Sequence, residues 1–183
     1  MISVDTIASA MRVELPLHSQ THLLDIGAGT GLISLRLRPD IGALTAIDTS
    51  PGMLAQLSQK AEKMGAKVTT EVWDLLASPY PTQQFDAAIS AMVLHHIRDT
   101  ALFFQRVHAL LHPGGVFAIA DLCTEDGTFH EEMDGVYHTG FDPQHLGALL
   151  SQNGFHSPRH GIVHVIQKAK DYPVFLLCAT RDR

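Results

Sequence analysis

The chain lacks most of the features that mark a secreted or membrane-spanning protein. Only two of its 183 residues are cysteine, Cys123 and Cys178, and their wide separation does not suggest the disulfide framework of a small secreted domain. No apolar run approaches the roughly 20 residues of a membrane-spanning helix. The first residues also lack the basic segment followed by an apolar one that is typical of a signal peptide. We therefore expect a cytoplasmic protein.

Positive charge is scarce as well. The 13 Lys and Arg residues are outnumbered by 19 Asp and Glu, which gives a formal net charge of −6, and the basic residues form no cluster. Because nucleic-acid binding normally needs a cationic face, we expect a small-molecule substrate as the partner, with neither nucleic acid nor membrane. The oligomeric state is left open. With 45% hydrophobic residues and no linker or repeat, residues 1–183 are expected to form one domain.

Apolar runs that alternate with amphipathic segments predict an α/β fold. The predicted strands are 22–26, 43–48, 67–73, 85–91 and 116–122, followed by 161–169 and 172–180 around a short polar turn. The predicted helices are 3–12, 31–37, 51–64, 100–111 and 143–153. This order indicates a Rossmann-like, doubly wound, mostly parallel sheet with an antiparallel C-terminal hairpin strand.

Three glycines follow the first predicted strand, in "THLLDIGAGTGLI" at residues 21–33. Gly27, Gly29 and Gly31 would form the turn into the next helix, where the backbone must approach a ligand closely or adopt a positive φ. The pattern alone is also compatible with nothing more than a tight turn. Its Gly-x-Gly-x-Gly spacing differs from the Gly-x-Gly-x-x-Gly expected where a helix N-terminus holds a pyrophosphate.

Acidic side chains stand at the ends of the next two predicted strands. Asp48 lies 21 residues after Gly27, where a carboxylate can accept hydrogen bonds from both hydroxyls of a ribose. Asp74 follows the third strand, within reach of an adenine amino group. Each acid alone could be a solvated residue or a helix cap. Together, at successive strand ends of one sheet, they indicate a nucleoside site.

The succession of these motifs resembles that of the class I S-adenosylmethionine-dependent methyltransferases, especially the small stand-alone branch that methylates metabolites. The matching segments span about residues 21–121 and are "LLDIGAGTG", "AIDTSPGML", "VWDLL", "FDAAISAMVLHHI" and "LLHPGGVFAIADL". The resemblance implies S-adenosylmethionine as cofactor, with Asp25 and the glycine loop facing its methionine part. It further implies Asp48 at the ribose, Met53 and Asp74 at the adenine with the backbone of Leu75, and Ser90 and Ala91 beside the sulfonium.

Histidines supply the candidate bases for methyl transfer. Since the cofactor brings the activated methyl group, the protein positions and sometimes deprotonates the nucleophile, and imidazole suits that role near neutral pH. His95 and His96 follow the fourth predicted strand, and His130 and His138 lie in the long segment 120–142. For each of them a capping, buried structural or merely solvated role is the alternative.

The segment 120–142 is also the expected lid. Only about twenty residues precede the first strand, so the longer N-terminal cover usual in such families must be replaced from elsewhere, or the site is open. Long loops at the ligand edge are often functional. His130, Glu131, Asp134 and His138 could instead bind a metal, although their spacing matches no strong metal signature, and no metal is predicted.

Two other classes of function fit parts of the pattern. A nicotinamide-dependent oxidoreductase would also use a glycine loop and Asp48, but the glycine spacing and Asp74 count against it. A non-catalytic protein that binds a cofactor or metal is compatible with the same fold. The ionisable residues in 120–142 favour an enzyme that transfers a methyl group to a small-molecule nucleophile, whose methylated atom the sequence does not identify.

Overall fold

A single seven-stranded sheet forms the centre of the molecule in the computed structural model, which describes residues 4–77 and 83–182. The strand order is β3-β2-β1-β4-β5-β7-β6, with β7 antiparallel to both of its neighbours and β1 to β5 mutually parallel. The predicted doubly wound sheet with its reversed hairpin strand is confirmed. The strands are β1 (His22–Ile26), β2 (Ala43–Asp48), β3 (Thr69–Val72), β4 (Phe85–Ala91), β5 (Leu111–Leu122), β6 (Phe155–Gln167) and β7 (Asp171–Arg181).

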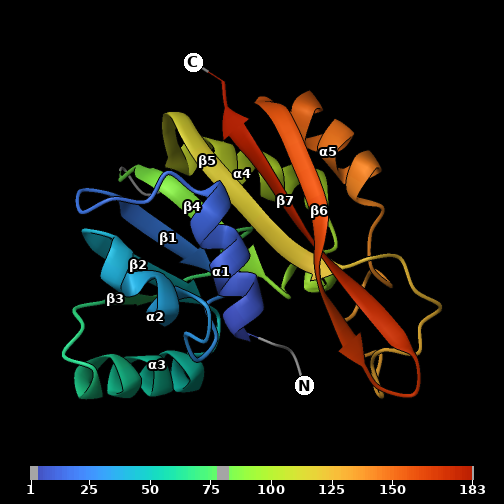
Figure 1. Ribbon diagram of the computed structural model, residues 1–183, viewed down its shortest axis with the longest axis horizontal. Helices are drawn as coiled ribbons and strands as arrows, with labels where there is room; N and C mark the ends of the chain where they lie inside the picture. Colours follow the sequence, from blue (N-terminus) through green and yellow to red (C-terminus); the bar gives the residue numbers. More distant parts are fainter. Residues whose placement is uncertain (1–3, 78–82, 183) are drawn as a thin grey trace.

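Helices lie on both faces of this sheet, with α1 in front of it and α4 behind it in Figure 1. The helical elements are α1 (Val4–Glu14), α2 (Ser34–Leu37), α3 (Pro51–Lys63), α4 (Thr100–Leu110) and α5 (Pro143–Gln152), with 3-10 turns η1 (Arg38–Asp40) and η2 (Leu94–His96). Caps set their starts: the Ser50 hydroxyl accepts from Met53 N at 3.3 Å, and Asp99 accepts from Leu102 N at 2.9 Å. Within the described residues no helix has the length and apolarity to cross a membrane.

Several element boundaries differ from the prediction. The helix predicted over 31–37 begins only at Ser34, because Gly31 has a φ of 74° and the chain is still in the glycine turn. The third strand shortens from 67–73 to Thr69–Val72 at the exposed edge of the sheet. In contrast, β5 and β6 begin earlier than predicted, at Leu111 and Phe155. The first residue of the predicted helix 3–12 lies outside the described residues.

The central strands β1, β2, β4 and β5 are buried on both faces, as is typical of parallel sheets, whereas the edge strands β3 and β6 are largely exposed. Alternate residues point to opposite sides, so that Ala118 of β5 packs in the layer of α1 while Phe117 and Ile119 pack in the layer of α4. Phe117 is fully buried, and its ring centroid lies 6.0 to 6.3 Å from those of Phe103, Phe104 and Phe155. This aromatic cluster joins α4 and β6 to the central strands that position the site.

Truncation of Phe117 should therefore be costly. We expect Phe117→Ala to lower the free energy of unfolding by about 3–5 kcal/mol, because it removes the buried ring and leaves a cavity among three other rings. Urea unfolding followed by circular dichroism measures this. Val13→Ala, at a side chain that is 82% exposed, is the control and should change stability by about 0.5 kcal/mol or less. A loss below about 1 kcal/mol for Phe117→Ala would contradict the packing described.

Candidate functional site

The strand order reverses between β1 and β4, and two adjoining cavities open there at the carboxyl ends of the strands. This is where open α/β sheets bind ligands. The larger cavity has a volume of about 550 Å³ and the smaller one about 370 Å³, both within the range of small-molecule sites. Four residues line both cavities: Gly27, Gly29, Met53 and Met92. The glycine loop is therefore the partition between two parts of one site.

Asp48 stands on the wall of the larger cavity and holds the glycine loop. Its Oδ2 accepts from Gly29 N at 2.8 Å, and its Oδ1 accepts from Ser50 N at 2.8 Å. Each carboxylate oxygen has a second lone pair, so Asp48 can still accept two hydrogen bonds from a ligand. The half-buried position leaves this capacity accessible from the cavity.

The segment after β3, next to the end of β2, also lines the larger cavity. Trp73, Asp74, Leu75 and Leu76 line it, and Leu75 is buried. The Asp74 carboxylate lies beyond the end of the strand, where its Oδ1 accepts from Leu76 N at 2.9 Å and from Ala77 N at 3.3 Å. Asp74 thus shapes its own turn while it borders the cavity. Met53, which is 46% exposed, also lines this cavity.

The smaller cavity contains a buried acid. Asp25 at the end of β1 lies in its wall and is only 4% exposed. The pKa of Asp25 is raised to about 7, mainly by burial; the Ser34 hydroxyl opposes this rise and the neighbouring carboxylate of Asp48 adds to it. A buried carboxyl group of this kind is stabilised in its ionised form by a cationic ligand group.

The short N-terminal segment does contribute cover, contrary to the sequence expectation. Val4 and Ile7 of α1 line the smaller cavity opposite the glycine loop. Sequence reasoning missed them because the position of α1 depends on its packing against the sheet. The backbone is tight here: a Cβ on Gly27 would lie 2.5 Å from a methyl carbon of Val93, and Met92 adopts a φ of 58°. Positive φ at a non-glycine residue is a strain that often accompanies functional sites.

A buried histidine–aspartate pair joins η2 to β5. His95 Nδ1 lies 2.7 Å from Asp121 Oδ1, and the two side chains are 2% and 0% exposed. Asp121 also accepts from the backbone N–H groups of His95 and Leu122. The carboxylate therefore favours the tautomer that carries the proton on Nδ1, which leaves His95 Nε2 free to act as an acceptor.

Two further imidazoles gather around His95. The ring centroid of His96 lies 4.2 Å from that of His95 and that of His130 lies 4.8 Å from it. His96 lines the larger cavity and its Nδ1 contacts Gly135 O at 2.8 Å. Burial lowers the pKa of His130, and the neighbouring His95, His96 and Lys168 lower it further. The structure thus brings together three of the four candidate histidines.

His138 is separate from this cluster. Its Nε2 lies 2.9 Å from Ile97 O, and its ring lies against Phe141. The loop that carries it, 123–142, is closed at its base by backbone hydrogen bonds from Thr124 N to Phe141 O and from Glu125 N to Thr139 O. In the described part of the chain, no group of three or more His, Cys, Asp or Glu side chains could hold a metal ion. Within this loop, His130 lies beside His95, whereas His138 contacts the backbone of Ile97 just after η2.

The remaining residues predicted from the sequence occupy different places. Ala91 lines the smaller cavity. Ser90 is buried, and its Oγ finds no hydrogen-bond partner among residues 4–77 and 83–182. Gly31 packs behind the loop against Leu57, away from both linings. Asp121 was missed by sequence reasoning, although an acid inside an otherwise apolar strand is a signal that could have found it.

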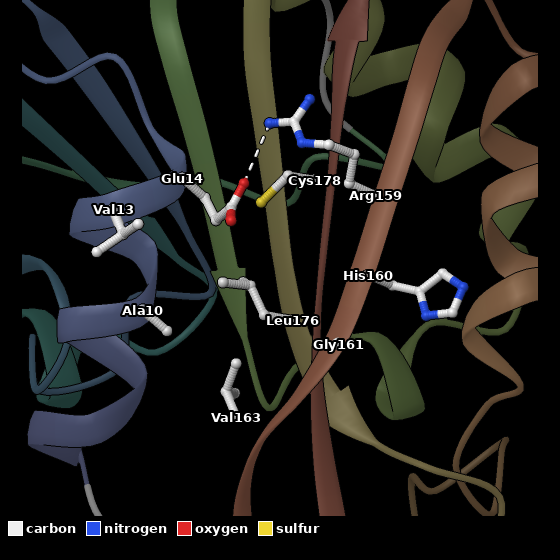
Figure 2. A pocket seen from close by; sticks show the side chains of 9 residues that line it. All are labelled: Ala10, Val13, Glu14, Arg159, His160, Gly161, Val163, Leu176 and Cys178. Atoms are coloured by element: carbon white, nitrogen blue, oxygen red, sulfur yellow. Dashed lines mark hydrogen bonds and ion pairs between the residues drawn. The ribbon is translucent and has the colours of Figure 1, made fainter.

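Another cavity lies elsewhere, between α1 and β6 (Figure 2). It measures about 300 Å³ and has an apolar floor that includes Leu176 and Cys178. The two charged residues on its rim, Glu14 and Arg159, pair with each other at 3.1 Å. Burial raises the pKa of Cys178 to about 12, so its thiol is a poor nucleophile. The cavities at the glycine loop, by contrast, are lined by Asp25, Asp48 and His96.

The sequence of the chain is similar to those of known methyltransferases. A family model described as a methyltransferase domain matches residues 23–115, which hold the glycine loop, Asp48 and His95. The chain belongs to the class I S-adenosylmethionine-dependent methyltransferase family.

An uncharacterized methyltransferase of Mycobacterium bovis is 32% identical over 132 residues, covering 70% of this chain and 64% of the relative. Another, from Schizosaccharomyces pombe, is 32% identical over 141 residues, covering 68% of this chain and 49% of the relative. The chain thus spans about half to two thirds of the length of these relatives.

Solved structures confirm the methyltransferase fold. A phosphoethanolamine N-methyltransferase of Haemonchus contortus in complex with S-adenosyl-L-methionine has a TM-score of 0.78 and 19% identity, over 98% of this chain and 52% of that chain. The [4+2]-cyclase SpnF has a TM-score of 0.80 and 18% identity, over 97% of this chain and 80% of that chain. At such identities the likeness concerns the fold alone, which hosts more than one kind of reaction.

Burial of Asp25 makes stability depend on pH. Its pKa is about 7 in the folded protein against an ordinary 3.8, so between these values the folded state binds more protons than the unfolded state. The contribution of Asp25 to the free energy of unfolding is then greatest below pH 4 and declines, by roughly 4 kcal/mol, as the pH rises to 7. Asp25→Asn cannot ionise and should not show this decline.

Urea unfolding of wild type and Asp25→Asn at pH values from 4 to 8 measures the difference. The exposed Asp171→Asn serves as a control for the loss of one acid and should keep the wild-type pH dependence. Parallel profiles for wild type and Asp25→Asn would show that Asp25 is ionised in the folded protein throughout.

Proposed function

We propose that the chain is an S-adenosylmethionine-dependent methyltransferase that acts on a small-molecule nucleophile. The proposal rests on one observation: four ionisable side chains, those of Asp48, Asp25, His95 and Asp121, lie near the same edge of the sheet. Asp48 holds the glycine loop at the larger cavity, and Asp25 lies in the wall of the adjoining one. His95, in η2 after β4, is paired with Asp121 near the end of β5. The first two suit the two ends of the cofactor, and the pair suits a proton acceptor.

The residues present fit this cofactor. The two free acceptor sites of Asp48 match a pair of ribose hydroxyls, while Met53, Leu75 and Asp74 border the space for an adenine. Asp25 would meet the ammonium group of the methionine part, and a positive group there would relieve the cost of burying its carboxylate. Ser90 and Ala91 would lie beside the sulfonium end. The close approach of backbone at Gly27 and Gly29 leaves room for the link between the two parts.

When bound, the cofactor supplies an electrophilic methyl group on a sulfonium. The protein must then hold the nucleophile in line and accept its proton where it has one. His95 is suited to this because Asp121 orients the ring and stabilises the imidazolium that forms, as a carboxylate does for a catalytic histidine. His96 and His130, in ring contact with His95, would border the nucleophile.

The relatives support a small-molecule substrate without identifying it. A ubiquinone biosynthesis O-methyltransferase of Methylocella silvestris is 33% identical over 100 residues, covering 55% of this chain and 39% of the relative. A general base is useful for a hydroxyl or amine nucleophile, whose proton must leave during transfer. We accordingly propose a nucleophile with a removable proton, such as a phenol or an amine.

Binding of the cofactor depends on Asp48 in this proposal. We expect Asp48→Asn to weaken binding of S-adenosylmethionine at least about 10-fold, because an amide lacks one of the acceptor oxygens that a ribose diol requires. Isothermal titration calorimetry measures this for S-adenosylmethionine and for its demethylated product.

The exposed Glu62→Gln on α3 is the control and should bind like wild type. NADH titrated into the wild type distinguishes the oxidoreductase alternative and should give no heat. The proposal fails if S-adenosylmethionine gives no heat with the folded wild type, or if NADH binds in its place.

Catalysis depends on the buried pair. We expect His95→Gln and Asp121→Asn each to lower kcat about 100-fold or more, because one removes the proton acceptor and the other its orienting carboxylate. Affinity for S-adenosylmethionine should stay within about 2-fold of wild type, since neither side chain lines the cofactor cavities. Turnover with a panel of phenols and amines measures the first effect, and calorimetry measures the second. Unchanged kcat in both variants would remove the pair from the mechanism.

A further inference from the structure

We propose that Lys168, in the turn between β6 and β7, is a positioning residue that holds His130 in the histidine cluster through Phe129. The proposal rests on the proposed function only in so far as His130 borders the reacting groups. Lys168 is separated from Phe129 by 39 positions in the sequence, and it lies in the C-terminal hairpin that sequence reasoning treated as purely structural.

Two contacts join Lys168 to the residue before His130. Lys168 Nζ donates a hydrogen bond to Phe129 O at 2.7 Å, and the same nitrogen lies 4.0 Å from the centroid of the Phe129 ring. Phe129 is 8% exposed, and its ring meets the His130 ring edge-on at a centroid distance of 4.8 Å. One ammonium group therefore holds both the backbone and the ring on which His130 rests.

The same hairpin holds the loop at other points, but not at His130. Tyr172 Oη and Thr128 Oγ1 are 2.8 Å apart, and Lys170 pairs with Asp126. These contacts involve residues farther from His130 along the loop. Phe129, the residue before His130, is contacted by the Tyr172 ring at a centroid distance of 5.1 Å and by Lys168. Of these two, Lys168 is the one that binds the Phe129 backbone, so its loss should change the placement of His130 while Tyr172 and Lys170 keep the loop attached.

The positive charge of Lys168 also affects the protonation of His130. His130 is faced by His95 and His96 from the segment after β4, by Lys168 from the hairpin and by Glu125 from its own loop. Burial and the first three lower the pKa of His130, and Glu125 raises it. The buried Nε2 of His130 has no hydrogen-bond partner in the described residues. Lys168 thus favours a neutral His130 ring, whose buried Nε2 has unused hydrogen-bonding capacity.

The test compares Lys168→Met, which keeps an apolar stem but cannot donate or carry charge, with Lys168→Arg, which can do both. The primary measurement is an NMR titration of the histidine ring signals, in which His130 is assigned by its loss in His130→Gln. We expect the pH midpoint of His130 to rise in Lys168→Met and to stay near the wild-type value in Lys168→Arg. Lys63→Met, at an exposed position on α3, should leave the midpoint unchanged.

Turnover separates positioning from a general structural role. We expect Lys168→Met to lower kcat about 10-fold in the wild-type background and to have no further effect on His130→Gln. An unchanged midpoint of His130 in Lys168→Met overturns the proposal, as does an equal loss of activity in both backgrounds. The titration needs no substrate or cofactor, so it decides on Lys168 even if S-adenosylmethionine proves not to bind.

Discussion

The attachment of the glycine loop to the end of β2 is the constraint on which the rest of the site depends. Gly27 N and Ala28 N donate to Ile47 O at 2.9 and 3.0 Å, and Asp48 Oδ2 accepts from Gly29 N at 2.8 Å. These bonds hold the loop in positive φ, which glycine tolerates. Gly27 and Gly29 consequently bring bare backbone to both cavities, while Ala28 and Thr30 line the smaller one, and helix α2 begins only at Ser34. The same carboxylate that organises the loop retains acceptor capacity for a ligand.

The second half of the site is built by bringing together segments that are distant in the sequence. The turn after β4 carries Met92 in positive φ and leads to His95, while β5 supplies Asp121 from the adjacent strand. The loop after β5 then returns with His130, held by the C-terminal hairpin through Lys168. Each contribution is a side chain on a rigid element or on an anchored loop, which is what precise placement of a proton acceptor requires.

Family and fold do not by themselves determine the reaction. A cyclase and an N-methyltransferase share the fold with TM-scores of 0.80 and 0.78 at less than 20% identity, so the reaction depends on the side chains at the carboxyl edge of the sheet. In this chain those side chains include Asp48 on the wall of the larger cavity, Asp25 on the wall of the smaller one, and the buried pair of His95 and Asp121. The apolar cavity between α1 and β6 offers no comparable set of groups.

The sequence by itself determined the fold class, the order of strands and helices along the chain, and the places of Gly27, Asp48 and Asp74 at the ends of strands. These follow from local periodicity and from motifs confined to a few residues. It could not show that Asp121 pairs with His95, that His130 joins this pair while His138 does not, or that α1 supplies Val4 and Ile7 to the cavity wall. Those facts depend on contacts between segments far apart in the sequence, such as His95 and Asp121, which are 26 positions apart. Packing of the whole sheet and its helices decides such contacts, and no local pattern of residues encodes them.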